Sequence, residues 1–581
     1  MASARASCPV WGPTGVLYFA SDRTGVAQAF RLDGADRAAV QVANNRLRTL
    51  PVAAVQGGLL VRQDDGGGEI WQLTLVGPDG GQRRLTRDLH AIHRTVRVDP
   101  NGGRAGISYN PKGGVDWALG TIDLRSGEIE TWTAPDGNWG WMGWDPSGRR
   151  AMVARIETGL KNQAFVVDGP GGEMTPILPD ARLVSTVFFA SGGMYAITNL
   201  DREYLGLVEV DRADPRRIFR RLVDEDGDVL GAVPSPSGEL VTVIHNRGLY
   251  DQLSIHNLVT GETRAPEVPR PGVVYTDNTT SPADQIAWDS DSRRLFVAWE
   301  SSTAPAEICE VISGTRWTTE SGDPIPGLVE PSLVHFTTFD GLQIPALHYK
   351  LDDRPRPTMV YFHGGPESQS RANFQPGLAI WNAAGLNVLA PNVRGSTGHG
   401  VSYEDLDNRE LRWDAVRDGV AAGRWAQEHG GATHLVVMGA SYGGFMTLAV
   451  LIEDPELWVA AVDVVGIADW HDFFRTTSGW RRSSRVPEYG EPNGPDGLFL
   501  ARFSPLARAA EIRADLLIVH GRNDPRVPLS QAEKIHAAVV GSELMVLDDE
   551  GHGIVKHANR ALAYGRALDF VLERLGREGS A

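Results

Sequence analysis

A turn motif that recurs about every 45 residues constrains the fold of this chain more than any other feature. Most copies combine an apolar or aromatic residue with Pro or Ser and then Gly, and each precedes a short apolar segment. Successive copies are separated by 44, 43, 46, 45, 45 and 54 residues. Several short strands per unit of this length are typical of β-propeller blades. The aligned turn positions are Pro13, Gly57, Pro100, Pro146, Ser191, Pro236 and Ser290.

Seven copies predict a seven-bladed β-propeller, which we expect to occupy residues 1–325. Segments such as LVTVIHN (240–246) and RLFVAWE (294–300) read as short strands, and this half of the chain contains no convincing amphipathic helix. An array of β-sandwiches is the alternative interpretation. The nearly equal spacing of the seven turns favours the propeller.

Residues 326–581 have a different pattern and are expected to form a second domain. Apolar strands alternate there with longer helical stretches, which indicates a mostly parallel sheet covered on both faces. An opening hairpin is expected at 333–351; the other expected strands are 358–362, 386–391, 434–440, 459–465, 515–520 and 543–548, and the helices are 412–429, 442–452, 529–540 and 556–575.

The segment VVMGASYGGFMTLAV (436–450) leaves one of these strands and turns sharply at Ser441 into a helix. A Gly-x-Ser-x-Gly match alone is weak evidence, and an incidental serine on a glycine-rich turn is the alternative. Between a buried strand and a helix, however, the motif is that of a nucleophile elbow. We therefore predict a β + α/β chain, in which a seven-bladed propeller is followed by an α/β-hydrolase domain with Ser441 as its nucleophile.

A serine hydroxyl needs a base, and in this fold an acidic residue and then a histidine follow the nucleophile along the chain. His552 lies in a loop between a predicted strand and the last helix, whereas His520 ends a strand and His557 lies within a helix. His552 is therefore the predicted base. Asp524, in the loop after strand 515–520, is the predicted acid; Asp548 and Asp549 lie too close to His552 in sequence.

An oxyanion hole is also required. The backbone N–H of Tyr442, directly after the nucleophile, is the first predicted donor. The second is assigned to Gly365 in the turn His363-Gly364-Gly365-Pro366, which follows strand 358–362. An ordinary tight turn is the alternative reading of this segment.

Five motifs together resemble the prolyl oligopeptidase family of serine peptidases, most of all its acylaminoacyl-peptidase branch. They are HGGP (363–366), NVRGSTGHG (392–400), GASYGGFM (439–446), HGRNDPRVP (520–528) and EGHG (550–553). The resemblance implies a catalytic triad of Ser441, Asp524 and His552. It also implies that Arg526 binds a substrate carbonyl and that the propeller restricts access to short peptides.

Two departures from family patterns bear on specificity. Prolyl oligopeptidases proper and dipeptidyl peptidases have a tyrosine where His363 stands here, which favours the acylaminoacyl-like branch. The Glu-Glu pair with which dipeptidyl peptidases hold a free amine is not evident, and Glu203 is only a lone candidate. The chain also begins almost directly in the propeller, without the N-terminal helical extension common in the family.

Composition narrows the class of protein. A formal net charge of −17 argues against nucleic acid or anionic membrane as the main partner. The chain has two cysteines, no apolar signal segment and no long apolar run, so we expect a cytoplasmic protein. We expect no metal or cofactor. The protein is possibly a homo-oligomer.

The predicted function is hydrolysis of short peptides by an acylaminoacyl peptidase or oligopeptidase. The specificity pocket is expected to take apolar side chains from 464–480, such as Phe473 and Phe474, although this stretch could equally be core. The alternatives are a small-molecule esterase or amidase, an aminopeptidase or carboxypeptidase variant, and a binding scaffold with an inactive hydrolase domain.

Overall fold

The computed structural model describes residues 4–43, 46–64, 67–111, 114–134, 136–277, 279–318 and 322–578. The chain divides into two compact units. One comprises Ser3–Asp65 and Glu69–Asp323, and the other comprises Pro324–Ala581 with the short segments Met1–Ala2 and Gly66–Gly68.

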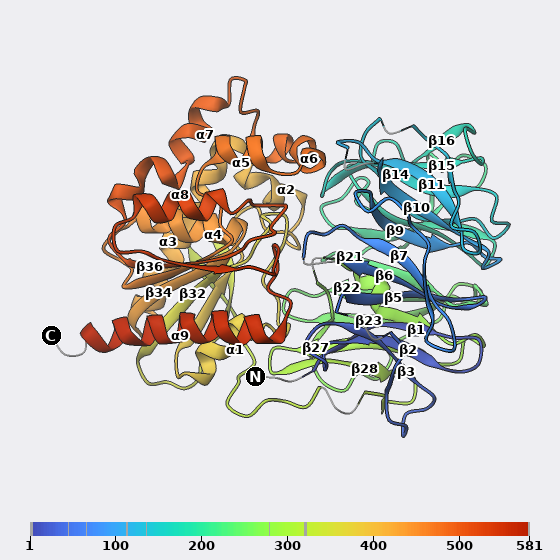
Figure 1. The fold of residues 1–581 in the computed structure, drawn as a ribbon, viewed down its shortest axis with the longest axis horizontal. Coiled ribbons are helices and arrows are strands. Elements are labelled where there is room, and N and C mark those ends of the chain that lie inside the picture. Colours follow the sequence, from blue (N-terminus) through green and yellow to red (C-terminus); the bar gives the residue numbers. More distant parts are fainter. Residues whose placement is uncertain are drawn as a thin grey trace. The chain divides into compact units, whose positions relative to one another are not determined.

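The first unit consists of seven consecutive antiparallel sheets, the blades of a β-propeller (Figure 1). Blade 1 comprises β1 (Ala6–Trp11), β2 (Leu17–Ser21), β3 (Gln28–Leu32) and β4 (Val40–Gln41), and blade 2 comprises β5 (Arg48–Val55), β6 (Gly58–Asp64), β7 (Gln72–Val76) and β8 (Gln82–Arg84). Blade 3 comprises β9 (Ile92–Val98), β10 (Arg104–Asn110), β11 (Ala118–Asp123) and β12 (Ile129–Thr131). Blade 4 comprises β13 (Trp139–Trp144), β14 (Ala151–Thr158), β15 (Lys161–Val167) and β16 (Met174–Ile177).

The last three blades follow the same order along the chain. They are β17 (Val184–Ala190), β18 (Gly193–Thr198), β19 (Gly206–Val210) and β20 (Ile218–Val223); β21 (Val229–Pro234), β22 (Leu240–Asn246), β23 (Asp251–Asn257) and β24 (Thr263–Arg264); and β25 (Val273–Val274), β26 (Ile286–Trp288), β27 (Leu295–Ser301), β28 (Ala304–Glu310) and β29 (Thr315–Arg316). The predicted propeller with seven blades is confirmed.

Each recurring turn connects two neighbouring strands of one blade, and in three of the seven turns a carboxylate explains the sequence. In the turn between β13 and β14, Oδ1 of Asp145 accepts hydrogen bonds from the backbone N–H groups of Arg149 and Arg150, at 3.0 and 2.9 Å. Asp99 and Asp289 make the same pair of bonds in their own blades. In these three blades the turn residues therefore recur because the same side-chain hydrogen bonds close the hairpin.

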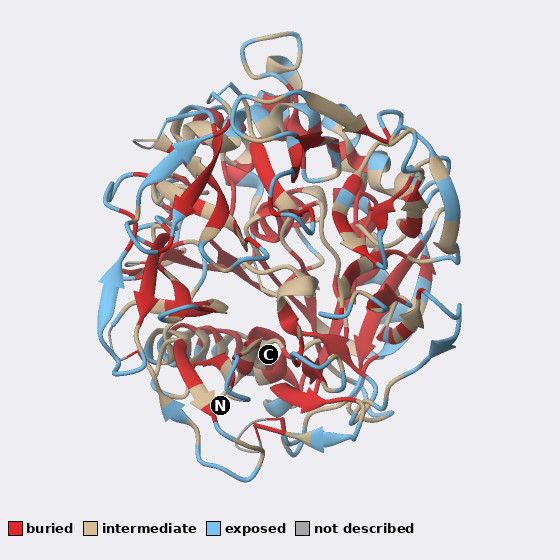
Figure 2. Ribbon diagram, turned by 90° about the vertical axis from the view of Figure 1, so that its right-hand side faces the viewer, coloured by how far each residue is buried: buried red, intermediate tan, exposed pale blue. Residues whose placement is uncertain are grey.

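The longer final step of the repeat, 54 residues, has a structural cause. Before its first long hairpin the seventh blade carries the extra strand β25 and a short 3-10 helix, Pro282–Gln285. Burial follows the blade pattern: β27 and β28 are buried throughout, whereas the outermost strands β8 and β12 are exposed (Figure 2).

The second unit contains one eight-stranded sheet in the order β30-β31-β33-β32-β34-β35-β36-β37. The first pairings, from β30 to β33, are antiparallel and those from β33 to β37 are parallel, as in an α/β-hydrolase. The strands are β30 (Ser332–Thr337), β31 (Gln343–Tyr349), β32 (Arg356–Phe362), β33 (Asn387–Pro391), β34 (Ala432–Ala440), β35 (Ala460–Val464), β36 (Asp515–Gly521) and β37 (Glu543–Leu547).

Helices cover both faces of this sheet: α1 and α9 lie on one face and α3, α4 and α8 on the other (Figure 1). The helices are α1 (Pro376–Ala383), α2 (Val401–Glu404), α3 (Arg412–Glu428), α4 (Tyr442–Glu453), α5 (Trp470–Thr476), α6 (Gly479–Tyr489), α7 (Gly497–Phe503), α8 (Ser530–Ala538) and α9 (His557–Glu578). In the described part of the chain no helix is both long and apolar enough to cross a membrane.

The opening hairpin, the other expected strands and the four expected helices all occur, with shifts of a few residues at their ends. The sequence did not reveal α1 or the insertion between β35 and β36, where α5, α6 and α7 follow one another. The polar sequence GWRRSSRVPEY of α6 explains part of this, because it lacks a broad apolar face and contains Pro487.

Candidate active site

Ser441 lies at the point where the buried strand β34 ends and α4 begins. Its backbone angles, φ 61° and ψ −118°, are strained for a residue with a side chain. The Ser441 N–H donates to Val464 O at 2.9 Å, and the Phe445 N–H donates back to Ser441 O at 3.1 Å. The turn is therefore fixed on both sides by backbone hydrogen bonds, as a nucleophile elbow requires.

The turn also packs too closely for side chains. A Cβ added to Gly443 would lie 2.1 Å from Phe362 O at the end of β32, so only glycine allows this approach. A Cβ added to Gly364 would lie 3.5 Å from the Cβ of Ser441. The loop that begins at His363 therefore lies directly against the candidate nucleophile.

The structure brings Asp524 and His552 together. His552 Nδ1 lies 2.6 Å from Asp524 Oδ2, and an ionised carboxylate can only accept, so Nδ1 carries the proton. The backbone N–H groups of Arg526 and Val527 donate to the other oxygen, Oδ1, at 2.8 and 3.0 Å. Burial would raise the pKa of Asp524, but the charge and hydrogen bond of His552 outweigh it and hold this pKa below its ordinary value.

Glu550 and Asn523, which the sequence analysis did not assign to the site, support the Asp524–His552 pair. Glu550 is fully buried, and its carboxylate accepts from the N–H groups of Val555 and Lys556, at 3.2 and 2.9 Å. Its backbone oxygen accepts from Asn523 N at 2.9 Å. The His552 loop is thereby tied to the Asp524 loop. Glu550 belongs to the EGHG motif, which was the only sequence signal that could have identified it.

His520, weighed as a base in the sequence, is buried and its Nε2 lies 2.8 Å from Val527 O. The same nitrogen lies 3.8 Å from Asp524 Oδ2, and burial lowers the pKa of His520. A buried neutral imidazole bonded to the backbone supports the shape of the Asp524 loop. The competing carboxylate Asp548 is instead exposed and pairs with Arg522 at 2.7 Å.

The loop after β32 is held in place by a second loop, 392–400. His363 is buried, and its Nε2 lies 2.9 Å from Ser396 Oγ. Thr397 N donates to Ser368 O at 2.9 Å, and Ser370 N donates to Asn392 Oδ1 at 2.6 Å. The motifs HGGP and NVRGSTGHG therefore form one structural unit beside Ser441.

Arg526 and the expected pocket residues are placed as follows. The Arg526 backbone oxygen accepts from Thr477 Oγ1 at 2.8 Å, so the Asp524 loop is anchored to the insertion that contains α5.

Phe473 and Phe474 are buried in the core of the domain, where both rings contact Tyr489. Their burial agrees with the reading of this stretch as core. Glu203, the lone propeller candidate for an amine ligand, is exposed.

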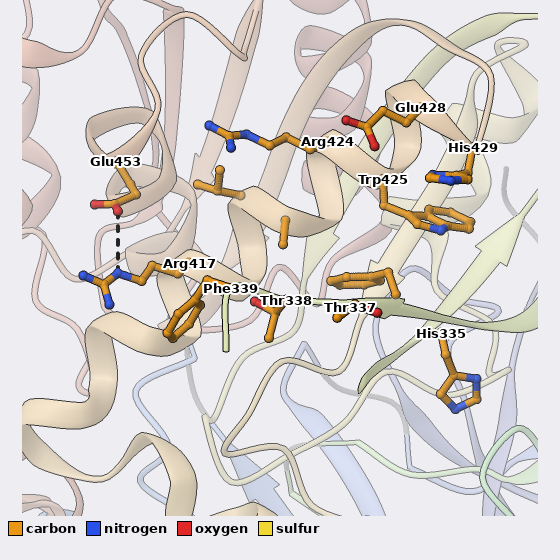
Figure 3. Close-up of a pocket in the computed structure, with 13 residues that line it drawn as sticks. His335, Thr337, Thr338, Phe339, Arg417, Arg424, Trp425, Glu428, His429 and Glu453 are labelled. Atoms are coloured by element: carbon orange, nitrogen blue, oxygen red, sulfur yellow. Dashed lines mark ion pairs between the residues drawn. The ribbon is translucent and has the colours of Figure 1, made fainter. Parts of the chain in front are cut away.

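A large surface cavity lies elsewhere in the catalytic domain. It has a volume of about 750 Å³ and lies between β30 and α3, lined among others by Phe339, Arg417 and Trp425 (Figure 3). Arg417 pairs with Glu453 at its edge, at 3.8 Å. None of the candidate catalytic residues lines it.

Comparison with known proteins relates the C-terminal domain to a known family. Residues 372–578 match the model of the prolyl oligopeptidase family. The C-terminal domain belongs to the prolyl oligopeptidase family. It is thus a domain of a serine peptidase family, and the elbow at Ser441 and the Asp524–His552 pair lie within the matched region.

Curated relatives of the prolyl oligopeptidase domain have several specificities. The chain is 32% identical over 235 residues to "Dipeptidyl aminopeptidase BIII" of Pseudoxanthomonas mexicana, covering 39% of this chain and 34% of that protein. It is 27% identical over 221 residues to "Acylamino-acid-releasing enzyme 1" of Oryza sativa subsp. japonica, covering 35% and 28%. The chain spans about a third of the length of the curated relatives it matches.

Solved structures match the fold over almost the whole chain. A puromycin-hydrolyzing peptidase of Mycobacterium tuberculosis superposes with a TM-score of 0.83 at 18% identity, covering 99% of this chain and 95% of that one. The Pyrococcus horikoshii acylaminoacyl peptidase gives 0.70 at 15% identity, covering 98% and 96%. A propeller followed by a prolyl oligopeptidase domain is therefore the shared architecture.

Proposed function

We propose that this protein hydrolyses short peptides through an acyl-enzyme formed on Ser441. Ser441 Oγ attacks the scissile carbonyl, His552 takes its proton and later gives it to the leaving amine, and Asp524 orients the imidazole. The N–H groups of Tyr442 and Gly365 receive the developing oxyanion. The observation that carries the proposal is the 2.6 Å hydrogen bond from His552 Nδ1 to Asp524 Oδ2, in a domain of this family.

The N-terminus of α4 adds to this electrostatic arrangement. The first N–H groups of a helix have no partner within the helix, and the helix dipole favours negative charge at this end. Tyr442 is the first residue of α4, directly after Ser441. Its N–H is thus available to an oxyanion formed on a carbonyl that Ser441 attacks.

The specificity that we propose is that of an acylaminoacyl peptidase or oligopeptidase, with the propeller limiting substrates to short peptides and Arg526 binding a substrate carbonyl. The buried His363, bonded to Ser396, supports this branch because it leaves the oxyanion to backbone donors alone. A free-terminus aminopeptidase or carboxypeptidase uses the same chemistry, and the relatives include a dipeptidyl aminopeptidase as well as an acylamino-acid-releasing enzyme.

The test is one short peptide prepared in three forms, N-acetylated, with a free N-terminus and C-terminally amidated, with products read by mass spectrometry. Wild type, Ser441→Ala and the matched control Ser332→Ala, on the edge strand β30, would be compared. Cleavage by wild type and Ser332→Ala that is lost in Ser441→Ala supports the proposal. Release of an acetylated amino acid identifies an acylaminoacyl peptidase, and trimming from a free end identifies the alternative specificity.

A small-molecule esterase is the second candidate function, because the same triad cleaves activated esters. Hydrolysis of esters by wild type without cleavage of any peptide form would establish it and refute the peptidase proposal. Undiminished peptide cleavage by Ser441→Ala would refute the assignment of the nucleophile.

A further inference from the structure

The two proposed oxyanion donors are joined by a buried network of side chains outside the triad. Tyr489 Oη, from the end of α6, donates to Gly365 O at 3.1 Å. Tyr442 Oη donates to Asp407 Oδ2 at 3.2 Å. Each donor residue is thus held by the hydrogen bond of a phenol hydroxyl. For Tyr442 the hydroxyl is its own, and for Gly365 it is that of Tyr489, which binds the Gly365 carbonyl oxygen.

Arg412 connects these two contacts. Its guanidinium donates to Asp407 Oδ2 at 2.8 Å, to Glu488 Oε1 at 2.5 Å and to Glu488 O at 3.1 Å. The guanidinium carbon also lies 5.1 and 4.6 Å from the ring centroids of Tyr442 and Tyr489. With only 2% of its surface exposed, Arg412 is enclosed by the groups that it binds.

A third attachment reaches the same loop two residues after Gly365. Arg485 Nη1 donates to Glu367 Oε2 at 3.4 Å. The loop that carries Gly365 is therefore attached at the Gly365 carbonyl and at the Glu367 side chain. Both attachments are made by residues of the segment 485–489 of α6. Arg412, through Glu488, fixes that segment against α4.

Fold stability alone explains this arrangement poorly. Taking an arginine and its carboxylates out of water is costly, and apolar residues of similar volume often stabilise a core as well. A connected polar network does, however, fix the arrangement of the groups that it joins, even though Arg412 Nε and Asp407 Oδ1 have no hydrogen-bond partner among the described residues. An oxyanion hole needs this property, because its donors act only when they point at the developing charge at about 2.7–3.1 Å.

We propose that Arg412 and Tyr489 are positioning residues that fix the N–H groups of Gly365 and Tyr442 in position and direction relative to each other. The inference rests on the proposed function. Neither side chain needs to touch substrate: Arg412 sets the relative position of α4 and α6, and Tyr489 transmits it to the Gly365 peptide. Loss of either loosens the oxyanion hole and leaves the Asp524–His552 pair intact.

The first test replaces Tyr489 by Phe, which removes one hydroxyl and keeps the packed ring. Its control is Tyr109→Phe in the propeller, where Tyr109 Oη lies 2.6 Å from Thr131 Oγ1, so that one tyrosine hydroxyl with a hydrogen-bond partner is likewise removed. The readouts are kcat, KM, and the affinity for a peptide boronic acid, whose tetrahedral adduct with serine requires the oxyanion hole. Affinity for uncleaved peptide is measured in the Ser441→Ala background.

We expect Tyr489→Phe to lower kcat and boronic acid affinity together by roughly 10-fold, less than the 10²–10³ typical for outright loss of a donor. Peptide affinity in the Ser441→Ala background should not change, and Tyr109→Phe should behave as wild type in every readout. Unchanged kcat and boronic acid affinity in Tyr489→Phe would overturn the proposal. So would a loss of peptide affinity equal to the loss of kcat, since that indicates a general distortion.

Arg412→Lys is the second variant, because lysine keeps the charge but not the fork that holds both carboxylates. The same paired loss of kcat and boronic acid affinity is expected, at least as large as in Tyr489→Phe. If Arg412→Lys does not fold, Tyr489→Phe decides the question. Failure of the proposed function is seen separately, as a wild-type protein that neither cleaves peptides nor binds the boronic acid.

Discussion

His552 and Asp524 are joined by a single short hydrogen bond, 2.6 Å from Nδ1 to Oδ2, while two backbone N–H groups saturate the other carboxylate oxygen. Every acceptor position that faces the imidazole or the loop is therefore in use. An amide in place of this carboxylate cannot satisfy both sides, because one of its two atoms is a donor.

Asp524→Asn should consequently lower kcat by about 10³–10⁴ while the melting temperature changes little. The amide group must either face the N–H groups of Arg526 and Val527 or force Nδ1 of His552 to accept, which yields the wrong tautomer. Steady-state hydrolysis of the peptide substrate and a thermal melt measure both quantities. Asp548→Asn, on an exposed carboxylate, is the control and should retain full activity; equal losses in the two variants would contradict the assignment.

Gly365→Ala should lower kcat by about 10²-fold. Gly365 has φ +130°, and a Cβ there would lie 2.8 Å from Glu367 N, so the peptide that carries the proposed oxyanion donor must move. The measurement is kcat together with reaction with a fluorophosphonate probe. Gly565→Ala is a suitable control, because an added Cβ at Gly565, within α9, meets nothing within 4 Å. Wild-type kcat in Gly365→Ala would show that this N–H is not a donor.

Glu550→Gln should reduce both activity and stability. One carboxylate oxygen becomes a donor that faces the N–H of Val555 or Lys556, and an unmet buried donor costs about 1–3 kcal/mol. The His552 loop then loses part of its anchor, and kcat is expected to fall roughly 10-fold. Urea unfolding and steady-state kinetics test the two effects. A stability loss without any change in kcat would limit Glu550 to a structural role; Glu573→Gln, on exposed α9, should change neither.

A pH dependence of stability is expected from Asp463, which is buried beneath the nucleophile elbow. Burial raises the pKa of this carboxyl group from 3.8 to about 7. Because the folded state holds the proton more tightly, the stabilisation is complete below about pH 4 and is lost as pH rises through about 7. About three units correspond to roughly 4 kcal/mol.

Asp463→Asn stays neutral and lacks this dependence. Its free energy of unfolding relative to wild type should therefore rise between pH 5 and pH 8, with urea titrations at both values as the measurement. Asp548→Asn again serves as the exposed control. Parallel pH profiles for wild type and Asp463→Asn would show that Asp463 carries the same charge in the folded and unfolded states over this range.

The propeller and the sheet were predictable from sequence because each rests on local signals. The blade turns recur at nearly equal spacing, with a carboxylate such as Asp145 closing the hairpin in three blades, and the strand and helix patterns of the hydrolase domain have different periods. The candidate residues Ser441, Asp524 and His552 each lie at the end of a strand, in a fixed order along the chain, so motif and position identify them together.

The supporting network could not be predicted in this way. Arg412 and Glu488 are 76 residues apart, and Tyr489 and Gly365 are 124 apart. Nothing in the local sequence of α6 indicates that its last residues meet the loop after β32. Such partners become visible only when the insertion between β35 and β36 is folded onto the domain.

The strained backbone of Ser441 has a consequence for how inactive variants should be chosen. A φ of 61° with ψ −118° is easily adopted only by glycine, so the wild-type serine weakens the fold in order to project its hydroxyl. Ser441→Gly relieves that strain and should melt at a higher temperature than wild type, whereas Ser441→Ala retains it. Ser441→Ala is therefore the appropriate inactive variant for binding experiments. The rise in melting temperature of Ser441→Gly measures how much stability the strained position of the candidate nucleophile costs the fold.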